Sequence, residues 1–175
     1  MFSDPQKNIE QAQIPLGATV ADLGSGSGHY ARALSKAVGE NGKVYAVDIQ
    51  KDLLTKLKNE AMKEKMSNIE VVWGDVEKEK GTKLKDQSLD AVVISNLLFQ
   101  IDDVGALAIE TQRIVKKGGV VIIIDWSDSF GGLGPEQSKV FDKTNAGNFF
   151  SSRGFLFERE IDTGKHHYGI IMRKV

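Results

Sequence analysis

The sequence predicts a single α/β domain in which a doubly wound, mostly parallel sheet lies between two layers of helices, a three-layer sandwich. Five short runs rich in β-branched residues recur along the chain, separated by stretches in which apolar residues repeat at helical spacing. The run Val120–Ile124 is apolar at every position, as expected for an interior parallel strand covered on both faces. A length of 175 residues suits one domain with a sizeable core, and no linker or internal repeat divides it.

The expected parallel strands are Val20–Leu23, Val44–Val47, Ile69–Trp73, Ala91–Ile94 and Val120–Ile124. Asp4-Pro5 predicts the N-cap and first position of a short leading helix. The clearest helical stripe begins at Val104, and we expect that helix to end at Lys117, where Gly118-Gly119 would stop it.

The alternation of predicted strands and helices changes after Asp125. A glycine-rich loop, residues 126–135, leads to a weaker helical stretch around Val140–Phe150. Phe155–Ile161 and Tyr168–Met172 then have the pattern of two strands joined by residues 162–167. A connection this short joins antiparallel neighbours, so the C-terminus should add one antiparallel strand to the sheet.

Composition excludes several classes of protein. The formal net charge of −1 gives no general attraction for nucleic acid, although local patches of lysine occur. The absence of cysteine excludes disulfides and thiolate metal sites and suits a reducing cytoplasm, the expected location. No run approaches the roughly 20 apolar residues of a membrane helix, and the first residues lack the pattern of a signal peptide. The pair His166 and His167 is too small to predict a metal site.

The most informative stretch is TVADLGSGSGHY, residues 19–30, in which the first strand runs into a glycine loop. Ligands of such sheets bind at the carboxyl ends of the strands, where this loop lies. A P-loop would need a lysine after the glycines, and none is present. A dinucleotide fingerprint would need a glycine at position 29, where the chain has His29, so an NAD-dependent oxidoreductase is the weaker alternative.

Three carboxylates follow three neighbouring strands. Asp22 lies near the end of the first strand, Asp48 ends the second, and Asp75 follows the third. An acid at the position of Asp48 can accept both hydroxyls of a ribose. Together the three acids suit a ligand with a positive group, a free ribose diol and an adenine-like amine but no phosphate, which describes S-adenosylmethionine.

The motifs ADLGSGSG, VYAVDIQ, WGDV and LDAVVISNLL, in this order and spacing, resemble those of class I S-adenosylmethionine-dependent methyltransferases. Among subgroups, the chain is most similar to compact ubiquinone/menaquinone-biosynthesis-like and arsenite methyltransferase-like proteins, although arsenite methylation needs cysteines that it lacks. The resemblance implies a Rossmann-like sheet of seven strands in the order 3-2-1-4-5-7-6, with strand 7 antiparallel. It also implies S-adenosylmethionine as cofactor and S-adenosylhomocysteine as product.

The same resemblance implies the cofactor-binding residues. The glycine loop would approach the methionine part, Asp22 would hold that loop or reach the amino group, and Asp48 would bind the ribose. Ile49 would pack on the adenine, Asp75 and Val76 would bind its edge, and Ser95 and Asn96 would face the reacting centre. The full expected set is Asp22, Gly24, Ser25, Gly26, Gly28, Asp48, Ile49, Gly74, Asp75, Val76, Ser95 and Asn96.

The sequence does not name the methyl acceptor. No catalytic group is predicted with certainty, because a sulfonium methyl is already electrophilic and needs mainly a well-placed nucleophile. The candidates are Asn96, His29 and Tyr30, and other acceptor-side positions are Gln100, Trp126, Ser127, Asp128, His166 and His167. The run SNLLFQ after the fourth strand disfavours methylation of adenine or glutamine amino groups, because it lacks the Asn/Asp-Pro-Pro-aromatic tetrad of amino-methylating relatives.

The expected organisation is a single methyltransferase domain, residues 1–175. Residues 1–17 form an N-terminal helix or lid, residues 18–125 the cofactor-binding core, and residues 126–175 the substrate-side loop, last helix and hairpin. With no separate recognition domain, the acceptor is expected to be a small molecule, or a homodimer or activating partner supplies specificity. The alternatives are methylation of RNA or protein, and a non-catalytic subunit that binds the cofactor.

Overall fold

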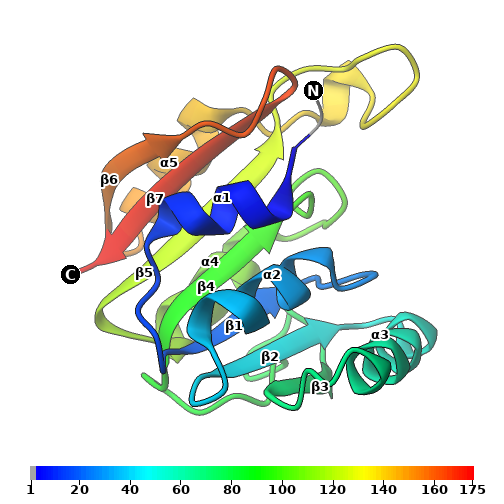
Figure 1. Cartoon of the computed structure of the whole chain (residues 1–175). Helices are drawn as coiled ribbons and strands as arrows, with labels where there is room; N and C mark the ends of the chain where they lie inside the picture. Colours follow the sequence, from blue (N-terminus) through cyan, green and yellow to red (C-terminus); the bar gives the residue numbers. More distant parts are fainter. Residues whose placement is uncertain (1–2) are drawn as a thin grey trace.

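The computed structural model describes residues 3–175 and contains one seven-stranded sheet flanked by helices (Figure 1). The strands are β1 Thr19–Leu23, β2 Lys43–Asp48, β3 Ile69–Trp73, β4 Leu89–Ser95, β5 Val115–Trp126, β6 Phe155–Ile161 and β7 His167–Lys174. The helices are α1 Pro5–Ala12, α2 His29–Val38, α3 Lys51–Lys63, α4 Val104–Ile114 and α5 Lys143–Ser151, with a short 3₁₀ turn at Gln137–Lys139.

The strand order is β3-β2-β1-β4-β5-β7-β6, as predicted. β1 to β5 run parallel to one another, and β7 is antiparallel to both β5 and β6. The predicted antiparallel hairpin at the C-terminus is therefore confirmed. The parallel register brings the carboxyl ends of β1, β2, β3 and β4 to one edge, where the glycine loop begins.

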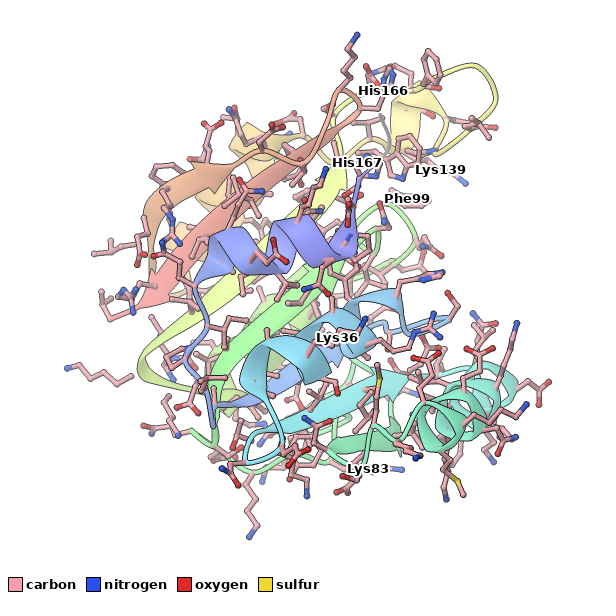
Figure 2. All side chains as sticks on the ribbon, viewed as in Figure 1. Lys36, Lys83, Phe99, Lys139, His166 and His167 are labelled. Carbon is pink, nitrogen blue, oxygen red and sulfur yellow. The ribbon has the colours of Figure 1, made fainter. Side chains whose placement is uncertain are left out.

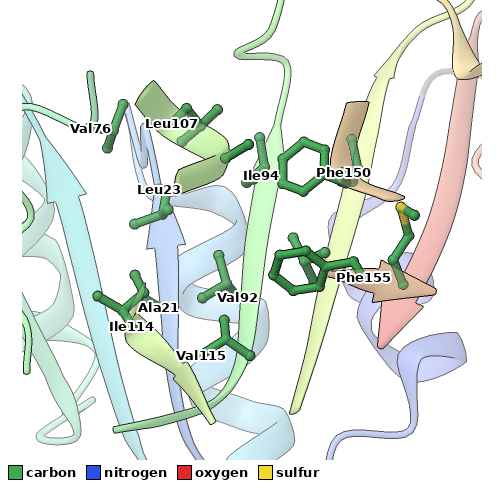
Figure 3. Close-up of a cluster of buried hydrophobic side chains, with 14 of the residues drawn as sticks. Ala21, Leu23, Val76, Val92, Ile94, Leu107, Ile114, Val115, Phe150 and Phe155 are labelled. Atoms are coloured by element: carbon green, nitrogen blue, oxygen red, sulfur yellow. The ribbon is translucent and has the colours of Figure 1, made fainter. Parts of the chain in front are cut away.

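Two apolar layers cover the two faces of the sheet. On one face, α4 and α5 pack against the strands through a cluster that includes Leu107, Ile114 and Phe150 (Figure 3). On the other face, side chains of α1, α2 and α3, among them Ile9 and Leu34, form the second cluster. In the run Val120–Ile124 of β5, the last four residues are completely buried, as expected, whereas Val120 is half-buried.

The leading helix begins as predicted. The Asp4 carboxylate accepts hydrogen bonds from the backbone N–H groups of Gln6 and Lys7, and Pro5 occupies the first helical position. α1 then packs on α2 through a buried polar contact, in which the Asn8 amide donates to the Tyr30 hydroxyl at 2.8 Å. The N-terminal segment is thereby fixed beside the edge that carries the glycine loop.

The predicted end of α4 at Lys117 is wrong. The helix ends at Ile114, and Val115 already has extended backbone angles and begins β5. The register pairs Leu89 with Val115 and then Ala91 with Val120, so residues 116–119 bulge out of β5 instead of extending a helix. Gly118, with a φ of +78°, belongs to this bulge.

Other boundaries differ less. The last helix covers Lys143–Ser151, later than the predicted stretch, because Asp142 caps it by accepting from the Asn145 backbone N–H at 2.9 Å. β7 begins at His167, which had been expected in the connection. This shift matters for the site, because a strand residue has a fixed register and His167 pairs with Trp126 of β5.

Candidate cofactor and acceptor site

Two adjoining cavities lie along the edge formed by the carboxyl ends of β1 to β4. Both are lined by Gly24, Gly26 and Gln100, so they form one continuous cleft. The first, of about 440 Å³, is further lined by Ser3, Pro5, Ser25, Ser27, His29, Tyr30, Ser95 and Asn96. The second, of about 410 Å³, is further lined by Asp48, Ile49, Gln50, Leu53, Gly74, Asp75, Val76, Glu77, Leu97 and Ile101.

The glycine loop is shaped by backbone bonds and by left-handed residues. The N–H groups of Gly24 and Ser25 both donate to the Val47 carbonyl, at 2.9 and 3.0 Å, which fastens the loop to β2. Gly26 has a φ of +52°, and a Cβ added there would contact no protein atom within 4 Å. The space in front of Gly26 is therefore left open for a ligand, as predicted for a loop that a ligand approaches closely.

Gly28 is required for a different reason. Its φ is +78°, and a Cβ at this position would lie 2.2 Å from Leu57 Cδ1 of α3. The residue therefore lets α2 begin tightly against α3, and His29 opens the helix directly after it. Gly28 thus serves packing, whereas Gly26 faces the cleft.

Asp22 is fully buried beneath this loop, with 1% of its surface exposed. Its Oδ2 accepts a hydrogen bond from the Ser25 hydroxyl at 2.9 Å, while its Oδ1 has no partner among the described residues. Burial raises the pKa of the carboxyl to about 7. Asp22 therefore holds the loop in place from beneath and lines neither cavity. The backbone N–H of Ala31, in the first turn of α2, also acts on this carboxyl and lowers its pKa against the effect of burial.

Asp48 lines the second cavity and is 6% exposed. Its two oxygens accept from the backbone N–H groups of Gly26 and Gln50, each at 2.8 Å. These bonds hold the carboxylate at the end of β2, where hydroxyls of a ligand can reach its remaining lone pairs. Ile49, which follows it, is 60% exposed and lines the second cavity.

The far end of the cleft is formed by the loop after β3. Asp75 accepts from the Glu77 backbone N–H at 3.0 Å and pairs with Lys78 at 3.0 Å, and the bond to Lys78 lowers the pKa of Asp75. A Cβ on Gly74 would lie 2.5 Å from the Gly81 carbonyl oxygen, so this glycine lets the loop fold back on itself.

The charge of the cleft is negative. The lining residues of the two cavities include three acids, Asp48, Asp75 and Glu77, and no lysine or arginine. Within residues 3–175, only Asp75 of the three acids has a cationic partner, Lys78, which lies outside the lining. A pyrophosphate would be repelled here, whereas a ligand with a cationic group and free hydroxyls would be matched. The described cleft therefore fits the predicted phosphate-free ligand better than a dinucleotide.

Polar groups of the turn after β4 lie at the end of the cleft that Ser95 and Asn96 line. Asn96 adopts a φ of +49°, a region that asparagine tolerates, and its N–H donates to the Ile124 carbonyl at 2.9 Å. The buried Asp125 accepts from the backbone N–H groups of Leu97 and Leu98, at 3.1 and 2.8 Å. Burial raises the pKa of Asp125 to about 6.

The C-terminal hairpin reaches the same place. His167 Nε2 lies 2.8 Å from Asn96 Oδ1, and the His167 ring packs on Trp126 with a centroid separation of 4.3 Å. His166 contacts Asp128 at 3.0 Å and stacks on Phe130 at 4.0 Å. Figure 2 shows both histidines at the end of the β6–β7 hairpin.

The other acceptor-side candidates are more dispersed. His29 is exposed at the start of α2 and lies at the rim of the first cavity. The buried Tyr30 also lines that cavity, but its hydroxyl is engaged by Asn8 and Ser3. Gln100 donates to the Asn96 carbonyl at 2.5 Å, and Ser127 is exposed and donates its N–H to the His166 carbonyl.

Comparison with known proteins decides the family. A family model described as "Methyltransferase domain" matches residues 16–165. The chain belongs to this methyltransferase family. Demethylmenaquinone methyltransferase of Oceanobacillus iheyensis is 29% identical over 119 residues, 68% of this chain and 49% of that protein. Ubiquinone/menaquinone biosynthesis C-methyltransferase UbiE of Hahella chejuensis is 29% identical over 135 residues, 77% of this chain and 52% of that protein.

A solved structure agrees with this assignment. A SAM-dependent methyltransferase from Aquifex aeolicus superposes with a TM-score of 0.89 and 28% identity, covering 99% of this chain and 91% of that chain. The chain thus has the expected Rossmann-like fold of the methyltransferase family. It spans about half the length of the curated relatives that it matches. None of its helices in residues 3–175 is long and apolar enough to cross a membrane.

The cleft of this methyltransferase contains most of the positions expected from the sequence. Ten of the twelve predicted cofactor residues line the two cavities. The other two are buried under the loop: Asp22 beneath it and Gly28 where it packs against α3. S-adenosylmethionine fits an open Gly26, an unpartnered Asp22 oxygen and a cleft without cations. The residues that would hold it are the glycine loop at the methionine part, Asp48 at the ribose, and Ile49, Asp75 and Val76 at the adenine.

Sequence reasoning missed two features of the site. Leu53, Leu97 and Ile101 form apolar walls of the second cavity, but their side chains look like ordinary core positions in sequence. Asp125 organises the loop after β4, and the available signal was a single acid at the end of the apolar run VVIII.

Proposed function

We propose that this methyltransferase methylates a ring carbon of a small hydroquinone-type acceptor. The observation that carries the proposal is the cavity at the methionine end, about 440 Å³, which has no lysine or arginine in its lining. That volume must hold part of the cofactor and leaves room for a ring, and the lining offers no cation for a nucleic-acid backbone. The named activities of the relatives, on demethylmenaquinone and in ubiquinone/menaquinone biosynthesis, support a quinone-type ring.

The side chains have distinct tasks in this proposal. When bound, S-adenosylmethionine would supply a methyl group on a sulfonium. The new carbon–carbon bond would take its electron pair from the acceptor ring. The electron pair of the carbon–sulfur bond would stay on sulfur, and the ring proton would leave to solvent. Asp48 and the glycine loop fix the cofactor, and Asn96 stands where the acceptor would meet it. This is catalysis by positioning, so no strong base is required in the cavity. The reduced ring is the proposed nucleophile, because hydroxyl groups donate electron density that quinone carbonyls withdraw.

The test is methyl transfer from labelled S-adenosylmethionine to demethylmenaquinone that has been reduced with borohydride. The expected result is label in the organic-extractable quinone fraction, with much less label when the acceptor is left oxidised. Total RNA and a cell-protein fraction serve as competing acceptors in parallel reactions. Label in RNA or protein would overturn the proposal. Tight cofactor binding without transfer to any acceptor would instead indicate a non-catalytic binding subunit.

A further inference from the structure

We infer that His167 is a positioning residue, which orients the Asn96 amide so that its Nδ2 hydrogens point at an oxygen of the acceptor. The inference rests on the proposed function, because it names what the acceptor must carry beside the reacting carbon. It begins from the contact between His167 Nε2 and Asn96 Oδ1, 2.8 Å apart although the residues are 71 positions apart in the chain. This contact joins the start of β7 to the turn after β4.

The tautomer of His167 follows from what its two ring nitrogens meet. Asn96 Oδ1 can only accept, so Nε2 must carry the hydrogen. His167 is 91% buried, since 9% of its surface is exposed, and its Nδ1 is buried with no partner among the described residues. A lone pair at Nδ1 suits that environment better than an N–H, because buried N–H groups without an acceptor are rare in native structures.

The opposite orientation of the Asn96 amide would exchange the donor and acceptor roles of the two His167 ring nitrogens. Asn96 Nδ2 would then donate to Nε2, and the proton of the ring would have to lie on Nδ1, buried without an acceptor. Burial and the neighbouring His166 also lower the pKa of His167, which keeps the ring neutral and the single-donor form populated. The unpartnered Nδ1 therefore favours the orientation in which Oδ1 faces His167.

The consequence for the cavity is a fixed donor. Asn96 lines the first cavity, while His167 is not among its lining residues and acts on it only through Asn96. Asn96 Nδ2 donates to no other atom of residues 3–175, so its hydrogens are available to a ligand. The His167 ring also packs on Trp126 with an interplanar angle of 38°, which restricts the orientation of the imidazole. An acceptor oxygen next to the methylated carbon, such as a hydroxyl of a hydroquinone, matches the donor.

The orientation can be tested without any acceptor. Long-range ¹H–¹⁵N correlation spectra of ¹⁵N-histidine-labelled protein, with S-adenosylhomocysteine bound, distinguish the two tautomers. The expected result is the Nε2–H tautomer for His167, and Nδ1–H would overturn the inference whatever the acceptor is. His167→Phe provides the assignment, because its spectrum lacks this resonance. A failure of the quinone reaction would leave this measurement intact, so the two proposals fail separately.

Methyl transfer then tests the consequence. His167→Phe keeps the aromatic packing and loses the donor, and should reduce kcat by about 10-fold to 100-fold. His167→Gln is the matched control, because its amide can donate to Asn96 Oδ1, and it should recover most of the rate. The dissociation constant for S-adenosylmethionine should stay within about 2-fold in both variants. A loss in His167→Phe that His167→Gln does not recover would indicate a merely structural role and overturn the inference.

A double variant tests whether His167 acts through Asn96. Asn96→Asp preserves the shape and the contact with His167 but replaces the donor with an oxygen, and should cost about 100-fold in kcat. Once that donor is gone, adding His167→Phe should cost nothing further. If the double variant instead shows the product of the two single losses in kcat, His167 acts independently of Asn96, which would overturn the inference.

Discussion

The cofactor side and the acceptor side of the cleft are built in different ways. On the cofactor side, each acid lies in or directly after its strand, and its bonds are to nearby loops: Asp22 to Ser25, and Asp48 to Gly26 and Gln50. On the acceptor side, Asn96, Trp126 and His167 come from β4, β5 and β7 and meet only through the folded sheet. The proposed cofactor side is thus shaped by bonds from strand ends to nearby loops, whereas the proposed acceptor side depends on the register of strands far apart in the chain.

The strongest test of this contrast is Asp48→Ala. The substitution removes the acceptor for two backbone N–H groups and for the predicted ribose contact. Loss of hydrogen bonds to a charged group, at about 1.5–3 kcal/mol each, should weaken S-adenosylmethionine binding by about 100-fold or more. Isothermal titration calorimetry measures this change in affinity. Asp52→Ala, at an exposed acid in the first turn of α3, is the control and should leave the affinity unchanged. Equal effects of the two variants would remove Asp48 from the site.

Substitutions of Gly26 and Gly28 should affect cofactor binding and protein stability to different degrees. Gly28→Ala combines a φ of +78° with a clash against Leu57, and should lower the free energy of unfolding by about 3 kcal/mol. Gly26→Ala strains the backbone but meets no protein atom, and should cost about 1 kcal/mol. Urea denaturation without ligand gives both values. Gly26→Ala should nevertheless impair cofactor binding, and an unimpaired affinity would show that the ligand does not approach that glycine.

The buried Asp22 predicts a pH dependence of cofactor binding. Its pKa is raised to about 7, so the carboxyl is partly protonated in the free protein near neutrality. A cationic group near the unpartnered Oδ1 favours the carboxylate, so binding should release a proton and strengthen by up to about 10-fold from pH 6 to pH 8. Calorimetry in buffers of different ionisation enthalpy detects the proton. An affinity that is flat over this range in the wild-type protein would place the cation elsewhere.

The same carboxyl affects stability with a definite sign. Because its folded pKa lies above the unfolded value of 3.8, the folded protein binds the proton more tightly. The contribution of Asp22 is therefore fully present below about pH 4 and is lost as the pH rises through about 7. Asp22→Asn should flatten this part of the pH–stability profile, and a profile unchanged by the substitution would contradict the shift.

The smallest effect is expected on the acceptor side. Phe130 is 45% exposed and stacks on His166, so Phe130→Ala should change the free energy of unfolding by about 0.5 kcal/mol or less. Cofactor affinity should also be unchanged, while KM for the proposed hydroquinone acceptor rises, because Phe130 stacks on His166 beside His167. A large loss of cofactor affinity in this variant would mean that the two sides are not separable.

The sequence by itself determined the fold class, the strand order through its family resemblance, and ten of the residues that line the cleft. Those features depend on apolar periodicity and on acids placed near strand ends, which are local and survive small errors in boundaries. The predicted helix end at Lys117 failed because residues 116–119 bulge out of β5, and the pairing of Leu89 with Val115 decides that. Only the tertiary structure placed His167 against Asn96, since this contact depends on the antiparallel register of β7 with β5, which a one-residue slip would abolish.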